Sequence, residues 1–202
     1  MKKKNSTAQR KKVKFDNKHL NDPKIKKVYL TFKKQLHSQI KNEKFCIGVS
    51  GGPDSLALAF LCKIFSKEFN SKFIALIIDH NLRKQSGIEA RKVKKILTKH
   101  KIRTKILTWK GKIPKSNIQF NARNIRYFLL NNECNKLNIK NLVLAHHEGD
   151  LIENFFIRLF RGSGLKGLSS LNIKRYSENN MLNLIRPLIN IKKDELIYIS
   201  KK

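Results

Sequence analysis

One glycine-rich segment contains the residue types and spacing best suited to binding an anion. Its residues are Ser50, Gly51, Gly52, Pro53, Asp54 and Ser55. The two glycines allow positive φ and a close approach of the backbone to a ligand, and Pro53 suits the first turn of a helix. Free amides at a helix N-terminus, with the helix dipole behind them, bind phosphate, and Ser50 and Ser55 add hydroxyl donors. The segment therefore predicts a phosphate-binding loop, with a plain capped turn as the alternative.

Asp54 is the unexpected member of this loop, because its carboxylate repels the phosphates that the loop would bind. A cation between them removes the repulsion, and carboxylate and phosphate oxygens are the ligands that Mg²⁺ prefers. We therefore expect Mg²⁺ to be held jointly by Asp54 and a polyphosphate. No lysine ends the loop, so the segment is not a Walker A motif.

Polar residues follow three of the apolar runs that read as strands. The loop at Ser50 follows the first run, Asp79-His80 follows the second, and His146-His147 follows the fourth. The carboxyl ends of parallel strands meet at one edge of a sheet, where ligands bind. We therefore predict that these three clusters form one site.

Strands and helices alternate along the chain, and the strands are apolar on both faces. This pattern predicts an α/β fold, a parallel sheet with helices on both faces. The expected strands are Phe45–Val49, Phe73–Ile78, Ile102–Trp109 and Leu142–Ala145. The expected helices are Leu56–Phe65, Gly87–His100, Ile118–Leu137 and Leu151–Phe160. In the second of these helices we expect Ile88, Val93, Ile96 and Leu97 to face the core.

The chain divides into three expected parts: residues 1–43, a basic arm and a helix; residues 44–190, the catalytic domain; and residues 191–202, the start of a truncated C-terminal helical region. The first helix is predicted from apolar residues at helical spacing. These residues are Ile25, Val28, Tyr29, Phe32 and Leu36. No apolar run is long enough to span a membrane.

The chain carries 45 Lys and Arg against 14 Asp and Glu, a formal net charge of +31. Such a charge attracts nucleic acid through its phosphates; the alternative is a composition biased toward Lys, Asn and Ile regardless of function. Cys46, Cys62 and Cys134 are far apart and form no CxxC pair, so we expect core thiols in a reducing compartment and a cytoplasmic protein.

The SGGPDS loop after a buried strand resembles the SGGxDS loop of the N-type ATP pyrophosphatases, the PP-loop superfamily. Three further segments in this order resemble the tRNA(Ile)-lysidine synthase family, over about residues 44–190. They are Ile78–Arg83 with Ser86 and Glu89, Asn121–Tyr127, and Ala145–Glu153 running into Arg161–Leu168. The resemblance implies a Rossmann-like fold of the adenine nucleotide alpha hydrolase type.

The resemblance also implies a reaction. ATP, with Mg²⁺, adenylylates O2 of the wobble cytidine (position 34) of tRNA(Ile) carrying a CAU anticodon. Free L-lysine then displaces AMP to give lysidine, which makes the protein a carbon–nitrogen ligase releasing AMP and pyrophosphate.

Roles follow for further residues. Arg123 and Arg126 share a helix face and suit a triphosphate or a tRNA backbone. We expect Asp79 beside ATP. Asp150 and Glu153 suit the lysine amine, next to His146. Gly162–Gly167 matches GxGxxG but follows a helix, so we interpret it as a loop carrying Arg161 and Lys166 toward tRNA, or as a plain interhelical loop.

The sequence departs from the family's HHxDD pattern at Gly149, where the first Asp is usual, and Asn154 replaces the usual Thr. A catalytically silent tRNA-binding module therefore remains an alternative. Thiocytidine, NAD and GMP synthesis share the loop and are further alternatives. A zinc site at His80, His146, His147 and Asp150 is disfavoured, because adjacent residues of an extended segment point to opposite sides.

Overall fold

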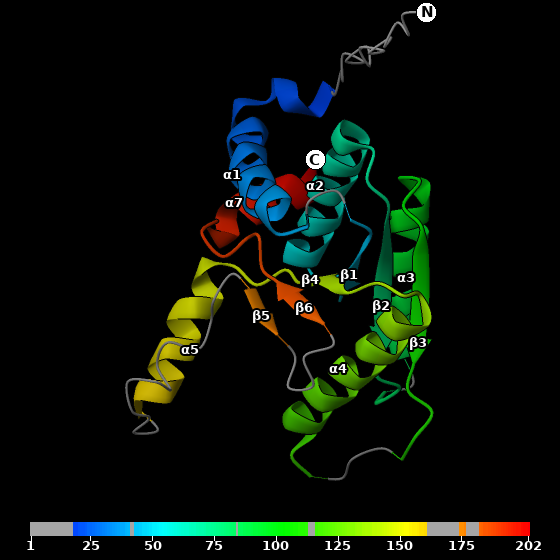
Figure 1. The fold of residues 1–202 in the computed structure, drawn as a ribbon. Helices are drawn as coiled ribbons and strands as arrows, with labels where there is room; N and C mark the ends of the chain where they lie inside the picture. The colour runs from blue at the N-terminus through cyan, green and yellow to red at the C-terminus, as the bar shows by residue number, and fades with distance from the viewer. Residues whose placement is uncertain (1–17, 41–42, 84, 113–115, 161–173, 177–181) are drawn as a thin grey trace, which may run out of the picture.

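The computed structural model describes residues 18–40, 43–83, 85–112, 116–160, 174–176 and 182–202. A six-stranded sheet has the order β3-β2-β1-β4-β6-β5 (Figure 1). The strands are β1 Phe45–Val49, β2 Phe73–Asp79, β3 Thr104–Thr108, β4 Asn141–Val143, β5 Lys174–Tyr176 and β6 Asn183–Ile185. The helices are η1 Lys18–Asn21, α1 Pro23–Ile40, α2 Pro53–Phe69, α3 Ser86–Lys99, α4 Ile118–Lys136, α5 Glu148–Phe160 and α7 Lys193–Lys201.

The predicted parallel sheet is confirmed, and all four predicted strands are present. β1 lies at the centre and pairs in parallel with β2 and β4, so that Phe45 lies opposite Phe73 and Asn141. The sequence analysis missed β6, which pairs in parallel with β4, and the antiparallel edge strand β5. Each has three residues, too few for a hydrophobic period to be visible.

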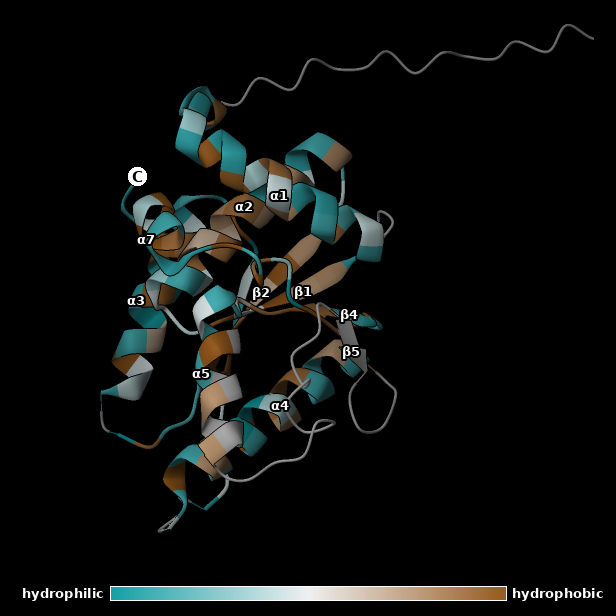
Figure 2. Ribbon diagram, turned by 90° about the vertical axis from the view of Figure 1, so that its left-hand side faces the viewer, coloured by the Kyte–Doolittle hydropathy of each residue, from teal (hydrophilic) through white to brown (hydrophobic). Residues whose placement is uncertain are grey.

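Helices cover both faces of the sheet, as predicted. Helices α1, α2, α3 and α7 contribute to one apolar cluster, and α4 packs on the opposite face. Figure 2 shows the apolar sides of these helices turned toward the strands. Successive side chains of β1 pack on opposite faces of the sheet. Phe45 and Ile47 belong to the first cluster, and Cys46 belongs to the second, together with Cys134 of α4. This alternation is the period-two geometry of a strand buried on both sides.

The prediction for the core side of α3 was half wrong. Val93 and Leu97 are buried, with Ala90 completing a stripe at positions i, i+3 and i+7. Ile88 and Ile96 are each 46% exposed. One helix presents a single narrow stripe to a flat sheet, and these two residues lie outside it.

Both ends of the described chain pack against α2. The five residues that predicted the first helix are all buried in α1, and Leu196 and Ile199 of α7 enter the same cluster. Tyr198 Oη donates to Asp22 Oδ2 at 2.6 Å and joins α7 to the start of α1. The proposed domain boundaries stay a prediction. No described helix is long and apolar enough to cross a membrane.

Candidate functional site

The predicted loop joins β1 to α2 at the carboxyl edge of the sheet. Helix α2 begins at Pro53, and Gly52 is its N-cap residue. Gly51 has φ +92°, the left-handed region predicted for it. Positive φ was wrong for Gly52, which has φ −70° and an extended backbone. A helix cap requires that extended conformation, so only Gly51 depends on the freedom of glycine.

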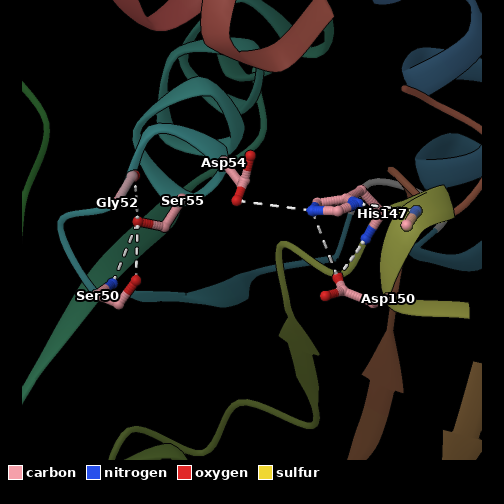
Figure 3. Close-up of polar contacts among 7 residues, drawn as sticks. Ser50, Gly52, Asp54, Ser55, His147 and Asp150 are labelled. Carbon is pink, nitrogen blue, oxygen red and sulfur yellow. Dashed lines mark hydrogen bonds and ion pairs between the residues drawn. The ribbon is translucent and has the colours of Figure 1, made fainter. Parts of the chain in front are cut away.

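Ser55 holds the loop closed from inside. Its buried hydroxyl oxygen accepts hydrogen bonds from the backbone N–H of Ser50 at 3.2 Å and of Gly51 at 3.1 Å. The hydroxyl donates in turn to the Gly52 carbonyl at 2.9 Å. The sequence predicted a donor to phosphate, whereas in this structure Ser55 shapes the turn on which a phosphate would rest. Figure 3 shows this network beside Asp54.

A cavity of about 500 Å³ opens beside this loop, at the sheet edge predicted for the site. The predicted site residues that line it are Ser50, Gly52, Asp54, Ser55, Arg126, His146 and Asp150. They come from the loop, from α4, and from the segment that leaves β4 and enters α5, and His80, which follows β2, lines the cavity as well. The expected convergence of the polar clusters is therefore present in the fold.

Five predicted site residues do not line the cavity: Gly51, Pro53, Asp79, Arg123 and Glu153. The buried carboxylate of Asp79 accepts hydrogen bonds from the Asn81 N–H and the Ser86 hydroxyl, and so shapes the turn after β2. Arg123 is exposed, with its guanidinium 5.2 Å from the ring centre of Tyr127. Glu153 is exposed on α5. Arg161 and Lys166 lie outside the described residues.

The two carboxylate oxygens of Asp54 have different surroundings. Its Oδ2 lies 3.7 Å from Nε2 of His147 (Figure 3). Its Oδ1 is buried and has no hydrogen-bond partner among the described residues. A buried carboxylate oxygen without a donor is costly unless a ligand completes it. Mg²⁺ fits this position, because it binds through one or two carboxylates together with phosphate oxygens.

The turn between β4 and α5 carries the second carboxylate. Asp150 Oδ2 accepts the backbone N–H of His147 at 2.8 Å, and Nδ1 of His147 accepts the backbone N–H of Gly149 at 3.0 Å. Nε2 of His147 also lies 3.9 Å from Asp150 Oδ2. The turn therefore fixes Asp150 at the cavity wall. No described cluster of three or more His, Cys, Asp or Glu side chains has the arrangement of a metal site.

His146 points to a different partner from His147. Its Nδ1 accepts a hydrogen bond from Nε of Arg186 at 3.2 Å. Burial lowers the pKa of His146 to about 4, and the positive charge of Arg186 adds to the effect. The ring is therefore neutral near pH 7 with its proton on Nε2. It can donate a hydrogen bond to a ligand but brings no positive charge.

The sequence analysis placed His80 and His147 in the polar clusters expected at this edge but assigned no role to them or to Tyr127; His80 and Tyr127 line the cavity. Nδ1 of His80 is buried and has no partner among the described residues, and burial lowers the pKa of His80 together with the charge of Arg126. His80 follows a predicted strand beside Asp79, so its position was a usable signal. The role of His147 depends on a contact across two turns, which no local pattern contains.

The chain is similar to two curated proteins named tRNA(Ile)-lysidine synthase. The protein from Orientia tsutsugamushi (strain Boryong) is 46% identical over 156 residues, covering 77% of this chain and 35% of the relative. The protein from Rickettsia rickettsii (strain Sheila Smith) is 40% identical over 173 residues, covering 84% and 36%. The chain thus spans about a third of the length of these relatives.

Solved structures share the fold. The U34-tRNA thiolase NcsA from Methanococcus maripaludis has a TM-score of 0.76 at 23% identity, covering 89% of this chain and 64% of that one. An NH3-dependent NAD synthetase from Campylobacter jejuni has a TM-score of 0.54 at 17% identity, covering 88% and 72%. The family model described as the PP-loop domain matches residues 23–202. Because this family model spans nearly the whole described structure, including the loop that lines the cavity, this chain belongs to the PP-loop domain family.

Proposed function

We propose that the chain carries the catalytic site of an ATP-dependent ligase that joins lysine to C2 of the wobble cytidine of tRNA(Ile) with a CAU anticodon. One observation carries the proposal: a single cavity is lined by the loop, by Asp54, whose buried Oδ1 has no described partner, and by Asp150. Relatives named tRNA(Ile)-lysidine synthase, 40–46% identical, support the choice among the reactions of PP-loop proteins.

The first half-reaction needs a held triphosphate and an attackable α-phosphorus. The uncapped N-terminus of α2 suits the pyrophosphate end of ATP. Asp54 would hold Mg²⁺, which when bound neutralises charge on the phosphates. Arg126 lines the same cavity, as does Arg83, and its guanidinium is suited to the negative charge of the triphosphate. Attack by O2 of the cytidine on the α-phosphorus then forms the adenylated base and releases pyrophosphate.

The second half-reaction forms a C2–N bond with the lysine ε-amine and breaks the C2–O2 bond, with AMP leaving. Asp150 is the group suited to receive the lysine ammonium and to take its proton. His146 is neutral, so it does not repel that ammonium, and its Nε2–H is suited to a substrate oxygen. Both roles require the side chains of His146 and Asp150 to face the substrate, and both residues line the same cavity.

The charge of the chain supports a tRNA partner, since +31 over 202 residues attracts a polyanion strongly. The three cysteines are free thiols buried in the core, which suits a reducing cytoplasm. The predicted contacts of Arg161 and Lys166 with tRNA belong to this proposal.

Incubation of the purified chain with ATP, Mg²⁺, labelled lysine and a tRNA(Ile) transcript tests the proposal. We expect label in the tRNA, AMP and pyrophosphate as products, and lysidine by mass spectrometry of the digested nucleosides. A transcript with the wobble cytidine replaced by uridine is the matched control and should take up no label.

Two other outcomes would contradict the proposal. Tight tRNA binding without label would favour a silent binding module, the alternative that Gly149 raises. ATP turnover driven by a small amine acceptor without tRNA would favour a small-molecule ligase. Because the chain corresponds to about a third of its relatives, the same assay with a longer chain separates a silent site from an incomplete one.

A further inference from the structure

The imidazole of His147 contacts both carboxylates that face the cavity. Nε2 lies 3.7 Å from Oδ2 of Asp54, on the phosphate loop, and 3.9 Å from Oδ2 of Asp150, on α5 (Figure 3). The side chain of His147 is only 7% exposed, whereas those of Asp54 and Asp150 are 25% and 34% exposed. A buried ring thus lies behind two carboxylates that reach the solvent side of the site.

The other ring nitrogen is already engaged. Nδ1 accepts the backbone N–H of Gly149 at 3.0 Å, and the backbone N–H of His147 donates to Asp150 at 2.8 Å. His147 and Asp150 therefore form a reciprocal cap on α5, with histidine in the position usually held by Ser or Thr. Because Nδ1 is an acceptor, the neutral ring carries its proton on Nε2, directed toward the carboxylates.

Gly149 leaves the space in which this ring lies. A Cβ at position 149 would meet Cε1 of His147 at 2.8 Å and Nδ1 at 3.1 Å. The first distance is shorter than carbon atoms tolerate, so any side chain at 149 requires the ring to shift. Glycine at position 149 lets the His147 ring accept the backbone N–H through Nδ1 and also lie with Nε2 near Asp54. The presence of Gly149, where the family usually has Asp, is therefore coupled to the position of the His147 ring.

We propose that His147 is a positioning residue for the metal-binding carboxylate, and that Gly149 is what allows it to act. Nε2 of His147 faces Oδ2 of Asp54 at 3.7 Å and restricts the orientation of a carboxylate whose other oxygen, Oδ1, is buried without a described partner. The same ring ties Asp54 to Asp150, which fixes the spacing between the phosphate site and the amine site. This inference rests on the proposed binding of Mg²⁺ and ATP at the loop.

When a residue that contacts a metal-binding side chain and orients it is removed, the metal affinity changes by roughly 10–100-fold. Two substitutions separate this role from the helix cap. His147→Ser keeps a good N-cap and removes Nε2. His147→Gln places an amide nitrogen at the position of Nε2 and weakens the cap.

The measurement is the Mg²⁺ concentration at half-saturation for ATP binding to the full chain, with the unfolding temperature recorded beside it. For His147→Ser we expect the Mg²⁺ midpoint to rise roughly 10-fold or more, with an unfolding temperature within about 2 °C of the wild type. For His147→Gln we expect a midpoint within about threefold of the wild type and a lower unfolding temperature. Glu148→Gln alters the same helical turn without touching the ring and should leave the midpoint unchanged.

Gly149→Ala tests the coupling. In the wild-type background its methyl group displaces the ring, and we expect the midpoint to rise about as much as in His147→Ser. In the His147→Ser background the obstacle is gone. The same alanine should then leave the midpoint unchanged and raise the unfolding temperature, since alanine favours a helix over glycine.

Additive effects of the two substitutions, or a wild-type midpoint in a folded His147→Ser variant, would overturn the inference. Absence of Mg²⁺-dependent ATP binding in the wild type would instead sink the proposed function. In that case nitrogen NMR of the histidine side chains still decides the contact. We expect the Nε2-protonated tautomer for His147 and a shift of its Nε2–H signal in Asp54→Asn. An Nδ1-protonated ring, or an unmoved signal, refutes it.

Discussion

Two turns at the same sheet edge are built in different ways. The turn from β1 to α2 is closed by its own residues: Gly51 supplies the left-handed backbone and Ser55 binds the loop amides. No side chain caps the N-terminus of α2. The turn from β4 to α5 is capped by side chains, with Nδ1 of His147 and the carboxylate of Asp150 occupying backbone donors.

The difference concerns what each turn leaves free. A helix N-terminus without a side-chain cap keeps its donors for an anion, which suits the phosphate loop. A capped N-terminus offers a rigid side chain instead, and here that side chain reaches across to Asp54 at 3.7 Å. The first turn thus suits the proposed binding of phosphate, and the second suits the proposed positioning of Asp54.

Asp54→Ala breaks the binding turn where it meets its proposed cation. We expect ATP-dependent turnover to fall by roughly 10²-fold or more, because a pre-set electrostatic contact to the phosphates is lost. The fold should survive, since Oδ1 has no described partner to lose. Initial rates at saturating ATP, with circular dichroism as the check of folding, measure this. Unchanged turnover in a folded variant contradicts a metal role for Asp54.

The pH dependence of stability tests the positioning turn through His146. Its pKa is about 4 in the folded chain, against an ordinary value of 6.5. Below pH 6.5 the unfolded chain binds a proton that the folded chain refuses until about pH 4, so this contribution is complete above 6.5 and is lost as the pH falls toward 4. Its size is no more than about 3 kcal/mol.

Urea unfolding at pH 4.5 and pH 7, for the wild type and for His146→Asn, isolates that contribution. The wild type should lose more free energy of unfolding on acidification than the variant does. Equal losses would mean that water reaches the ring and that the pKa of His146 is near its ordinary value.

Substitution of the two loop glycines sharpens the account of the binding turn. Gly51→Ala places a methyl group 2.5 Å from Cγ2 of Val93 at φ +92°, and we expect a loss of roughly 1–3 kcal/mol in the free energy of unfolding. Gly52→Ala is the matched control: its backbone is extended and its methyl group meets Ser50 Oγ at 3.8 Å. Its cost should stay below about 1 kcal/mol. Denaturant midpoints that coincide for both variants would refute a special role for Gly51.

The smallest effect is expected at the cavity rim, on the turn after β2. Arg83 Nη2 and Glu89 Oε2 lie 3.3 Å apart, with the side chains 74% and 55% exposed. Glu89→Gln should change the free energy of unfolding by less than about 0.5 kcal/mol, because exposed ion pairs contribute little. A larger loss in a urea titration would show that this rim supports the loop beside it.

The sequence was sufficient for features that depend on short-range chemistry. The SGGPDS segment predicted a strand-to-helix turn because glycine, proline and serine have local conformational preferences there. Helix α1 was predicted from apolar residues at helical spacing, and the central strand β1 and helix α2 were predicted from continuous apolar runs. The three-residue strands β5 and β6 were missed, since β6 is defined by its pairing with β4, and β5 by its pairing with β6.

Several residues that were predicted for the site do not line the cavity, because their surroundings depend on distant parts of the chain. Arg123 and Arg126 are three residues apart on α4, yet only Arg126 lines the cavity, and the guanidinium of Arg123 lies beside the Tyr127 ring instead. Asp79 was expected beside ATP, and its carboxylate is instead engaged by Asn81 and Ser86 in the turn after β2. Spacing fixes which residues share a face but not how far along the helix the partner lies.

The sequence by itself determined the phosphate loop, the parallel sheet and the edge at which polar residues would gather, because each follows from local backbone preference and from burial on two faces. Only the tertiary structure decided which oxygen of Asp54 is unpartnered, that His146 is held neutral by burial and Arg186, and that Gly149 makes room for His147. These properties depend on atoms distant in the chain that meet within a few ångströms, where desolvation and contact distance set the chemistry.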